Sequence, residues 1–474
     1  MIGITSYGAH IPMHRLTREE IARAHGGRKT PGEKAVCGFD EDSLTMAVAA
    51  ATDCLGDFDR KAVDGFFLAT TTSPYVEKMV STTAATALDL RPNIGTLDFT
   101  NSLRAGTGAL LSALNAVKAG SMKNVLVAAA DCRLTESKSD LEPVLGDGAA
   151  ALMLGDSNVA AVIEDSYSIS DEFIDLWRSY GDKFIRIWED RFAIDEGYSR
   201  VLPQAVSALL GKHKLTPGDL AKAVFYAPNE RRLRDMGKKL GLKPEQCQDE
   251  LLGNVGNTGT ALPLMMLVAV LEEAKPDDRI LLVGYGNGCD ALLLRVTKDI
   301  EKIRGKRGIR GSLSSRKALL SYQKYMQWRE LVSVAPAPRP ERLRTPVPEM
   351  WRDKRQNLAL CGATCKRCGT QQYPVQRVCV GCHAKDEFEL VRLSDKRAKI
   401  FTFTHDNLSP SVDPPASVAI VEFDGGGRWT FDVTDRDPQE LQVGMEVEFT
   451  FRKLNSGHGI HNYWWKVRPV GTPT

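Results

Sequence analysis

Apolar strand-like runs alternate with amphipathic helical stretches from residue 1 to about residue 298. Four of the runs, 63–70, 124–130, 223–226 and 279–286, read as buried strands, and this alternation predicts a layered α/β domain. The second and fourth runs each follow a helical stretch and lead into a loop. They take similar places in the two halves of the segment, which indicates an internally duplicated fold.

The pattern changes beyond residue 298. Residues 299–344 read as a linker with a basic stretch, a helical patch from Ala318 to Leu331, and the sequence Ala335-Pro336-Ala337-Pro338-Arg339-Pro340, which we expect to be extended. Over residues 391–474, short β-rich runs with glycine-rich turns predict a small five-stranded barrel of the OB type. The runs that carry this prediction are 399–404, 417–423, 428–431 and 445–451.

Four cysteines between the linker and the predicted barrel have the spacing of a metal site. Cys365 and Cys368 form one C-x2-C pair, and Cys379 and Cys382 form a second one ten residues later. Each pair can present two thiolates on one tight turn, and two such turns complete a tetrahedral zinc site. Four thiolates leave no open coordination position, so we predict a structural zinc in a ribbon over residues 345–390.

Composition narrows the class of protein. The 474 residues are 43% hydrophobic and 26% charged, with a net charge of +2, as in a globular protein without a general affinity for nucleic acid. The predicted barrel has no basic stripe interleaved with aromatic residues, which also argues against nucleic-acid binding. The chain contains no run of 18 apolar residues, so its sequence predicts no membrane-spanning helix. The first residues do not resemble a signal peptide. Ten cysteines, four of them clustered, favour a reducing cytoplasm.

Several segments of residues 1–298 resemble the 3-hydroxy-3-methylglutaryl-CoA (HMG-CoA) synthases of the thiolase superfamily. Those that carry the resemblance are Leu97–Gly108, Leu145–Ala151, Tyr180–Tyr198, Ala223–Asn229, Gly256–Thr260 and Gly284–Ala291. The C-terminal part resembles zinc-ribbon OB proteins that accompany thiolase-like enzymes acting on acyl-CoA. The resemblance implies a thiolase-like αβαβα fold, a coenzyme A thioester as substrate, and a homodimer formed through the thiolase-like domain.

The resemblance also places the family's catalytic residues on this chain. The acyl-accepting cysteine falls on Leu103, the glutamate on Thr71, and the histidine on Tyr226, whereas the asparagine is retained as Asn257. No histidine lies between residues 26 and 212 or between 214 and 382. A general acid or base in the predicted active-site loops must therefore be a tyrosine, a carboxyl group, a lysine or a thiol.

Loss of the thiol leaves the aldol step of HMG-CoA synthesis as the chemistry that needs no covalent attachment. We expect Asn257 to donate to a thioester oxygen, the backbone of the loop ending at Gly288 to support an oxyanion, and Tyr226 to exchange the hydroxyl proton. Arg104 and Arg231 are candidates to contact the phosphates of coenzyme A. The leading hypothesis is a carbon–carbon lyase that cleaves a 3-hydroxyacyl-CoA by a retro-aldol step, or condenses in reverse, as the similar steroid side-chain aldolases do.

Two alternatives stay open from the sequence. An acyltransferase, thiolase or HMG-CoA synthase would use a displaced nucleophile, for which Cys132 and Cys289 are the candidates because both lie at strand ends near the expected site. A non-catalytic subunit would bind acyl-CoA and stabilise a competent partner chain. The pattern fixes neither the acyl group nor the direction of the reaction.

Overall fold

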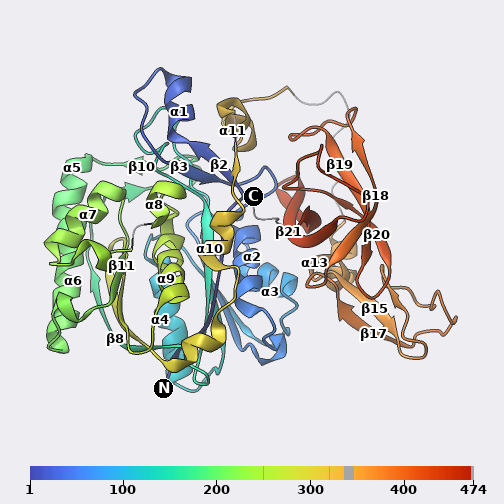
Figure 1. The fold of residues 1–474 in the computed structure, drawn as a ribbon, viewed down its shortest axis with the longest axis horizontal. Coiled ribbons are helices and arrows are strands. Elements are labelled where there is room, and N and C mark those ends of the chain that lie inside the picture. Colours follow the sequence, from blue (N-terminus) through green and yellow to red (C-terminus); the bar gives the residue numbers. More distant parts are fainter. Residues whose placement is uncertain (249, 320, 336–345, 471–474) are drawn as a thin grey trace. The chain divides into compact units, whose positions relative to one another are not determined.

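The computed structural model describes residues 1–248, 250–319, 321–335 and 346–470 (Figure 1). The chain divides into two compact units. The first comprises 1–37, 42–82 and 93–325, and the second comprises 38–41, 83–92 and the residues from Met326 onward. Within the described residues, the helices are all too short or too polar to cross a membrane.

A mixed sheet of nine strands forms the frame of the first unit, in the order β11-β12-β13-β8-β1-β7-β6-β4-β5. The strands are β1 (Gly3–His10), β4 (Gly65–Ala69), β5 (Gly95–Phe99), β6 (Val125–Asp131), β7 (Gly148–Gly155), β8 (Ala161–Ser170), β11 (Lys222–Phe225), β12 (Arg279–Tyr285) and β13 (Gly288–Val296). Four of them match the buried runs expected from the sequence. Their apolar side chains explain the match, because this sheet is covered on both faces.

The strand order confirms the internal duplication. In the first half β4 pairs parallel with β6, and β6–β7 and β7–β1 are antiparallel. In the second half β11 pairs parallel with β12, and β12–β13 and β13–β8 are antiparallel. The halves meet where β1 pairs with β8, and β5 is an additional strand at the edge of the first half.

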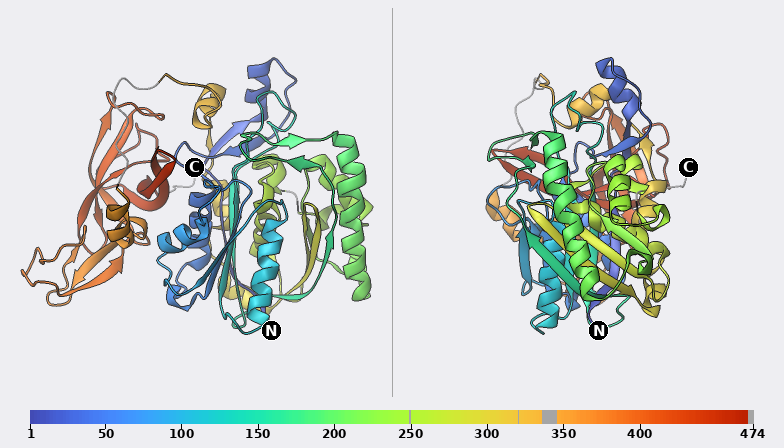
Figure 2. Two further views of the ribbon diagram at one scale, coloured as in Figure 1. Left: turned by 180° about the vertical axis from the view of Figure 1, so that it is seen from behind. Right: turned by 90° about the vertical axis from the view of Figure 1, so that its left-hand side faces the viewer.

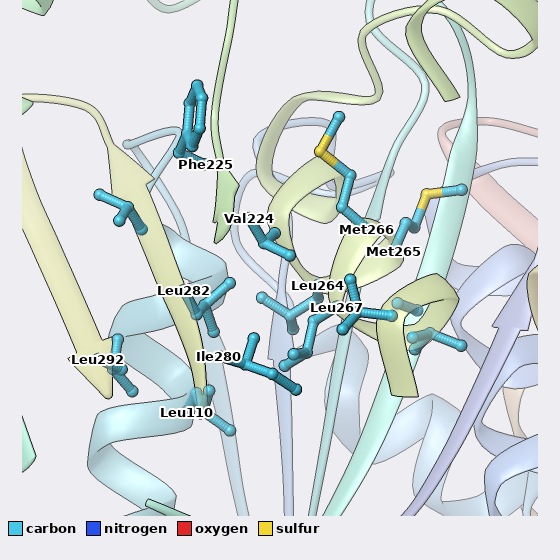
Figure 3. Packing of buried hydrophobic residues seen from close by; sticks show 14 of the residues in the cluster. Leu110, Val224, Phe225, Leu264, Met265, Met266, Leu267, Ile280, Leu282 and Leu292 are labelled. Atoms are coloured by element: carbon cyan, nitrogen blue, oxygen red, sulfur yellow. The ribbon is translucent and has the colours of Figure 1, made fainter. Parts of the chain in front are cut away.

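Two helices fill the layer between the halves. Helix α4 (Ala105–Lys118) packs on β4 and β6 and also on β12, and α9 (Leu262–Glu273) packs on β1 and β7 and also on β11 and β12. Residues 262–271 of α9 are all buried, as a helix between the two halves of the sheet requires. Figure 3 shows Leu110, Leu264 and Leu267 from these helices meeting Ile280 and Leu282 of β12.

Outer helices complete the αβαβα layering of the thiolase fold. Helix α2 (Ser43–Leu55) covers β1 and β7. Helix α6 (Ser199–Lys212), green in Figure 2, covers β8 and β13. The remaining helices up to residue 328 are α1 (Arg18–His25), α3 (Val80–Ala87), α5 (Asp190–Phe192), α7 (Glu230–Lys239), α8 (Glu250–Asn254), α10 (Gly308–Ser314) and α11 (Tyr322–Trp328). Short strands form two further sheets, β10 (Arg186–Ile187) with β9 (Leu176–Trp177), and β14 (Lys317–Ala318) with β2 (His14–Thr17) and β3 (Glu33–Val36).

Much of the expected linker folds onto the first unit. Helix α10 packs on β1 and α9, and β14 pairs parallel with β2. Basic side chains of this stretch are held in ion pairs, such as Arg304 with Glu301 and Arg316 with Glu33. The expected helical patch forms as α11, which begins at Tyr322. The proline-rich sequence lies outside the described residues from position 336 onward.

The second unit contains a small three-stranded sheet and a five-stranded barrel. The small sheet has the order β16 (Gln371–Gln372), β15 (Cys361–Cys365), β17 (Phe388–Arg392), and the helices α12 (Val347–Arg352) and α13 (Lys354–Leu358) precede it. The barrel strands are β18 (Ala398–Asp406), β19 (Ala416–Phe423), β20 (Arg428–Asp432), β21 (Glu446–Gly457) and β22 (Ile460–Pro469). A bridge between Val433 and Val467 connects the two ends of the order β20-β19-β18-β21-β22, so the sheet closes as an OB fold does.

Candidate active site

Leu103 lies on the turn between β5 and α4, where the sequence resemblance places it. The turn runs through Asn101 with a φ of 70° and ends at Arg104, the residue that precedes α4. Gly286 packs directly against it, since a Cβ atom there would lie 3.0 Å from the Leu103 nitrogen and 2.9 Å from the Ser102 hydroxyl oxygen. Ser102 donates to the Gly286 carbonyl at 2.9 Å. The close approach and the φ of 154° both require a glycine at position 286.

A cavity of about 150 Å³, called cavity 1 below, opens beside this turn. Leu103 lines it together with Thr71, which takes the place expected for the family's glutamate. The other lining residues are Asn101, Ser102, Arg133, Asp175, Leu176, Trp177, Arg178, Ile185, Gly286 and Asn287. Asp175 is the one carboxylate in this described lining, and neither a cysteine nor a histidine belongs to it.

Asp131 at the end of β6 fixes the position of Thr71. This fully buried carboxylate accepts hydrogen bonds from the Thr71 nitrogen at 2.7 Å and hydroxyl at 2.9 Å, and from the Thr260 nitrogen at 2.9 Å. The hydroxyls of Thr70 and Thr72 donate to it as well, each at 3.1 Å. With so many donors the carboxylate is fully engaged, so Asp131 holds two loops of the site together.

A second cavity of about 260 Å³, called cavity 2, adjoins the first. Arg133, Asp175, Leu176 and Ile185 line both cavities. Tyr226 and Asn257, both predicted as site residues, lie in the wall of cavity 2. Its remaining lining consists of Asp140, Leu141, Val144, Leu145, Ile187, Asp190, Ala193, Ile194, Tyr198, Pro228, Asn229 and Tyr285.

Asn257 and Tyr226 are hydrogen-bonded to each other. The Asn257 amide nitrogen donates to the Tyr226 hydroxyl oxygen at 3.1 Å and lies 3.3 Å from the carbonyl oxygens of Ala227 and Pro228. Its amide oxygen accepts from Arg133 Nη2 at 3.0 Å and from the Gly259 nitrogen at 2.9 Å. Donors on one side and acceptors on the other fix the orientation of the amide. Because its hydroxyl oxygen accepts from Asn257, Tyr226 keeps its own hydrogen for another acceptor.

Arg133 brings a positive charge to the same place. The residue is 6% exposed, and its Nε atom has no hydrogen-bond partner within the described residues. Burial raises the pKa of Tyr226, while the charge of Arg133 and the hydrogen bond from Asn257 act in the opposite direction. Burial is the largest of these effects, so Tyr226 is a neutral phenol at physiological pH.

Two more tyrosines enclose Tyr226. Its ring stacks on that of Tyr285 with 6.2 Å between centroids, and the Tyr198 hydroxyl donates to the Tyr226 carbonyl at 2.9 Å. Burial and the nearby Asp175 carboxylate raise the pKa of Tyr285, and burial also raises the pKa of Tyr198. All three phenols are therefore neutral, and each keeps a hydroxyl hydrogen that it can donate.

The other predicted site residues lie away from the cavities. Gly288 is buried as the first residue of β13, and its carbonyl accepts from the Gly286 nitrogen at 3.0 Å. Arg104 forms an ion pair with the buried Asp290 at 3.1 Å, and Arg231 on α7 is an exposed residue near Asp235. None of the three belongs to the described lining of either cavity. Gly286 and Asn287, the neighbours of Gly288, do line cavity 1.

Both candidate replacement thiols also lie outside the described linings. Cys289 is fully buried in β13 within the hydrophobic core, and burial raises the pKa of its thiol. Such a thiol is protonated and unreactive. Cys132 follows β6, and its backbone nitrogen donates to the Thr72 hydroxyl at 3.0 Å.

Comparison with known proteins identifies the family. The hydroxymethylglutaryl-CoA synthase of Pyrococcus horikoshii is 35% identical over 311 residues, which cover 64% of this chain and 89% of that protein. The hydroxymethylglutaryl-CoA synthase of Methanopyrus kandleri is 30% identical over 341 residues, covering 69% and 97% of the two chains. The chain belongs to the hydroxymethylglutaryl-CoA synthase family. A family model of the C-terminal part of 3-oxoacyl-[acyl-carrier-protein] synthase III also matches residues 210–296.

Solved structures agree on the fold of this family member. An HMG-CoA synthase complexed with CoA superposes with a TM-score of 0.63 at 19% identity, covering 69% of this chain and 89% of that one. The 3-oxoacyl-[acyl-carrier-protein] synthase III of Aquifex aeolicus superposes with a TM-score of 0.57 at 21% identity, covering 62% and 100%. Residues 390–452 match the model of the C-terminal OB-fold domain of ChsH2. The chain therefore joins a thiolase-fold enzyme domain to an OB-fold domain.

The four cysteines of the second unit form a compact set of candidate metal ligands. The Sγ atoms of Cys365, Cys368, Cys379 and Cys382 all lie within 4.8 Å of one another. Two of the separations are 3.7 Å and 3.5 Å, close to the edge of about 3.8 Å that four sulfurs at ~2.3 Å from a metal would define. Each pair lies on a tight turn closed by a backbone hydrogen bond, Gly369 to Cys365 and His383 to Cys379. Neither His383 nor Cys361 belongs to this cluster.

Sequence reasoning missed Arg133 and Asp175, which line both cavities. Arg133 comes two residues after a buried strand, and polar residues at strand ends are a usual signal for a site, so this position was open to prediction. Asp175 lies in an acidic stretch with Asp171 and Glu172, and nothing in the sequence sets it apart from them. Its place between the cavities depends on how this stretch folds back over the sheet.

Proposed function

We propose that this chain catalyses an aldol reaction on acyl-CoA without a covalent cysteine intermediate. A coenzyme A thioester and a ketone or aldehyde join to a 3-hydroxyacyl-CoA, or the same compound is cleaved by the retro-aldol step. The observation that carries the proposal is Tyr226, a buried neutral phenol that accepts from Asn257 in the wall of a cavity whose described lining has no thiol. Membership of a family of acyl-CoA condensing enzymes supports the choice of substrate class.

In this proposal the two cavities divide the substrates. The thioester carbonyl lies in cavity 1 beside Leu103, where Asn287 supplies a donor for the carbonyl oxygen in place of the expected Gly288. The ketone lies in cavity 2 with its oxygen on the Tyr226 hydroxyl. Asn257 orients Tyr226 in place of binding the thioester, since both of its amide hydrogens face protein acceptors.

The proposed proton transfers balance without a cofactor. Asp175 removes a proton from C2 of the acyl group, and the enolate carbon attacks the ketone carbon. As the new carbon–carbon bond forms, the carbonyl electron pair moves to the oxygen, which takes the Tyr226 proton. Arg133 stabilises the resulting phenolate, and the proton held by Asp175 restores the phenol. Cleavage follows the same steps backwards.

The neutral state of Tyr226 supports a donor role in condensation. A phenol with a raised pKa polarises a carbonyl group and protonates the alkoxide as it forms. This direction also agrees with the condensing enzymes that the chain is similar to. The cleavage that the sequence favoured remains the reverse of the same reaction.

Intact-protein mass spectrometry combined with product analysis tests the proposal. The full chain is incubated with acetyl-CoA plus a panel of ketones, and separately with 3-hydroxyacyl-CoA esters. We expect a condensed or cleaved product with no mass added to the protein, and no product from the Tyr226→Phe variant. A stable acyl adduct on a cysteine would overturn the cysteine-free route, and binding of esters without any product would favour the non-catalytic subunit.

A second candidate is an HMG-CoA synthase-type condensation that uses a displaced cysteine. The identity of the relatives favours it. Cys132 is the better nucleophile because it is only partly buried, whereas Cys289 lies in the core. This candidate requires an acyl-enzyme, and with Cys132 as the nucleophile it requires loss of activity in Cys132→Ser; retention of activity in that variant excludes Cys132.

We also propose a zinc ion in the four-cysteine cluster and a cytoplasmic location. Four thiolates in a closed tetrahedral arrangement suit zinc, and the ion would hold the two turns together without taking part in the reaction. A reducing compartment keeps such thiolates from oxidising. Metal analysis of the purified protein tests the identity of the ion.

A homodimer through the first unit completes the proposal. Edge strand β5 supports it, since Leu97 in the middle of this strand is 45% exposed. Light scattering measures the mass in solution. Leu97→Lys should weaken the dimer, and a monomeric wild-type protein would exclude it.

A further inference from the structure

Cavity 2 has one polar end and apolar walls. The polar end holds the Tyr226 hydroxyl, the Asn257 amide and the Arg133 guanidinium. The walls are side chains of Leu141, Val144, Leu145, Leu176, Ile187 and Ile194. Asp175 and Asn229 add polar groups to the lining, and the larger part of the wall that a ligand on Tyr226 would contact is hydrocarbon.

The depth of the cavity follows from the exposure of its walls. Leu145, Ile194 and Tyr226 are 4%, 6% and 2% exposed, so they form the inner surface. Ile187 is 40% exposed and marks the rim. Asp140 and Asp190 also lie at the rim as exposed residues, and Asp190 pairs with Arg232 at 3.4 Å. Carboxylates at the rim make this end unfavourable for a second anion.

Its volume sets the size of the occupant. An apolar protein cavity of about 150 Å³ is known to accommodate a benzene molecule. Cavity 2, at about 260 Å³, has room for a group larger than a benzene ring in addition to its contacts with Arg133 and Tyr226. A ketone whose two substituents are both methyl groups would leave most of this apolar space unfilled.

We propose that the substrate of this chain carries a bulky, uncharged apolar arm of aromatic or branched aliphatic character, which cavity 2 binds beside the reacting carbonyl. The proposal rests on the aldol function proposed above, because that function places the carbonyl oxygen on Tyr226. Val144 is the specificity-determining residue of the wall. It is half-buried and lines the cavity, and its own carbonyl accepts from the backbone nitrogen of Asn257 at 2.7 Å.

Calorimetric titration with unreactive esters tests the arm separately from turnover. The probes are butanoyl-CoA, 4-phenylbutanoyl-CoA and glutaryl-CoA, which lack the 3-hydroxyl group and cannot be cleaved. We expect the phenyl ester to bind at least about tenfold more tightly than butanoyl-CoA, since burying a ring adds several methylene equivalents of transfer free energy. Glutaryl-CoA should bind no better than butanoyl-CoA.

Filling the cavity supplies the decisive comparison. Val144→Phe should reduce the preference for the phenyl ester over butanoyl-CoA to about threefold or less. Val443→Phe, at a 67% exposed position of the second unit, is the matched control and should keep the wild-type preference. Ile187→Trp at the rim repeats the test if Val144→Phe does not fold.

The outcomes separate the two proposals. Equal affinity for the three esters, tighter binding of glutaryl-CoA, or an unchanged preference in both filling variants would overturn the apolar arm. The preference for the phenyl ester without any aldol product from matched hydroxyacyl esters would instead overturn the proposed reaction and leave the binding site in place.

Discussion

The Asn257 amide nitrogen lies 3.1 Å from the Tyr226 hydroxyl oxygen and donates a hydrogen bond to it. The amide cannot be turned around, because its oxygen faces Arg133 Nη2 and the Gly259 nitrogen. The Tyr226 oxygen is consequently occupied as an acceptor, which leaves the phenol its own hydrogen to donate. The contact joins two residues that are 31 positions apart in the sequence.

Replacing Tyr226 by phenylalanine removes that donor. We expect kcat for product formation to fall about 100- to 10,000-fold, the usual contribution of a positioned acid or base. The volume of the side chain is nearly kept, so the Kd for an unreactive acyl-CoA should change little. Tyr180→Phe is the control, as Tyr180 is 88% exposed and should retain full activity. Activity within threefold of wild type in Tyr226→Phe would contradict the assigned role.

The raised pKa of Tyr226 predicts the alkaline side of the pH profile. Burial keeps the phenol neutral beyond its usual pKa of about 10, so kcat/KM should be flat from about pH 7 to pH 9. The reaction consumes and releases no net proton, and both directions therefore share this dependence. An enzyme that attacks with a thiol would instead gain rate toward the thiol pKa of about 8.5. A rate that rises steadily through this range would speak for the cysteine route.

The positive charge of Arg133 leads to a separate prediction about kcat. Its positive charge opposes the effect of burial on Tyr226, so Arg133→Met should raise the pKa of Tyr226 further and make its phenolate less stable. We expect kcat to fall by about tenfold or more, and Arg133→Lys to recover part of the loss because it keeps the charge. Equal losses in the two variants would contradict a role for the charge alone and show that the shape and hydrogen bonds of the guanidinium are needed.

The four-cysteine cluster predicts the metal content of the protein. We expect about one zinc ion per chain, and its loss in Cys379→Ser, whose Sγ lies 3.5 Å from that of Cys368. Because binding of a structural metal is coupled to folding, the second unit should lose protection from proteolysis in this variant. Cys247→Ser, outside the cluster, should keep the metal. Full metal content in Cys379→Ser would exclude the cluster as the site.

Local signals explain which parts of the fold were predictable. The buried strands β4, β6, β11 and β12 are short apolar runs, and a sheet covered on both faces leaves that mark in any sequence. Strand β22 was not among the predicted runs, because it mixes Lys466 and Asn462 with its aromatic residues and reads as neither alternating nor apolar.

Site residues could be predicted only where they lie in a sequence motif of the family. Tyr226, Asn257, Leu103 and Thr71 were found through the family resemblance, and the structure places all four in the walls of the two cavities. Arg133 could be suspected from its place after a buried strand, but its contact with Asn257, 124 positions away in the sequence, could not be predicted. Spacing within one segment contains no information about such a contact.

Leu103 offers the sharpest contrast between a covalent and a non-covalent route. It lines cavity 1 next to the N-terminus of α4, a helix of 14 residues whose dipole favours an anion there. A thiol in this position should have a lowered pKa and react with acyl-CoA. Intact-protein mass spectrometry should therefore detect an acyl adduct on Leu103→Cys and none on the wild type. Ser121→Cys, an exposed position beyond the other end of α4, is the control and should stay unmodified. An adduct already present on the wild-type protein would mean that another cysteine has taken over the role, and the tyrosine route would then fail.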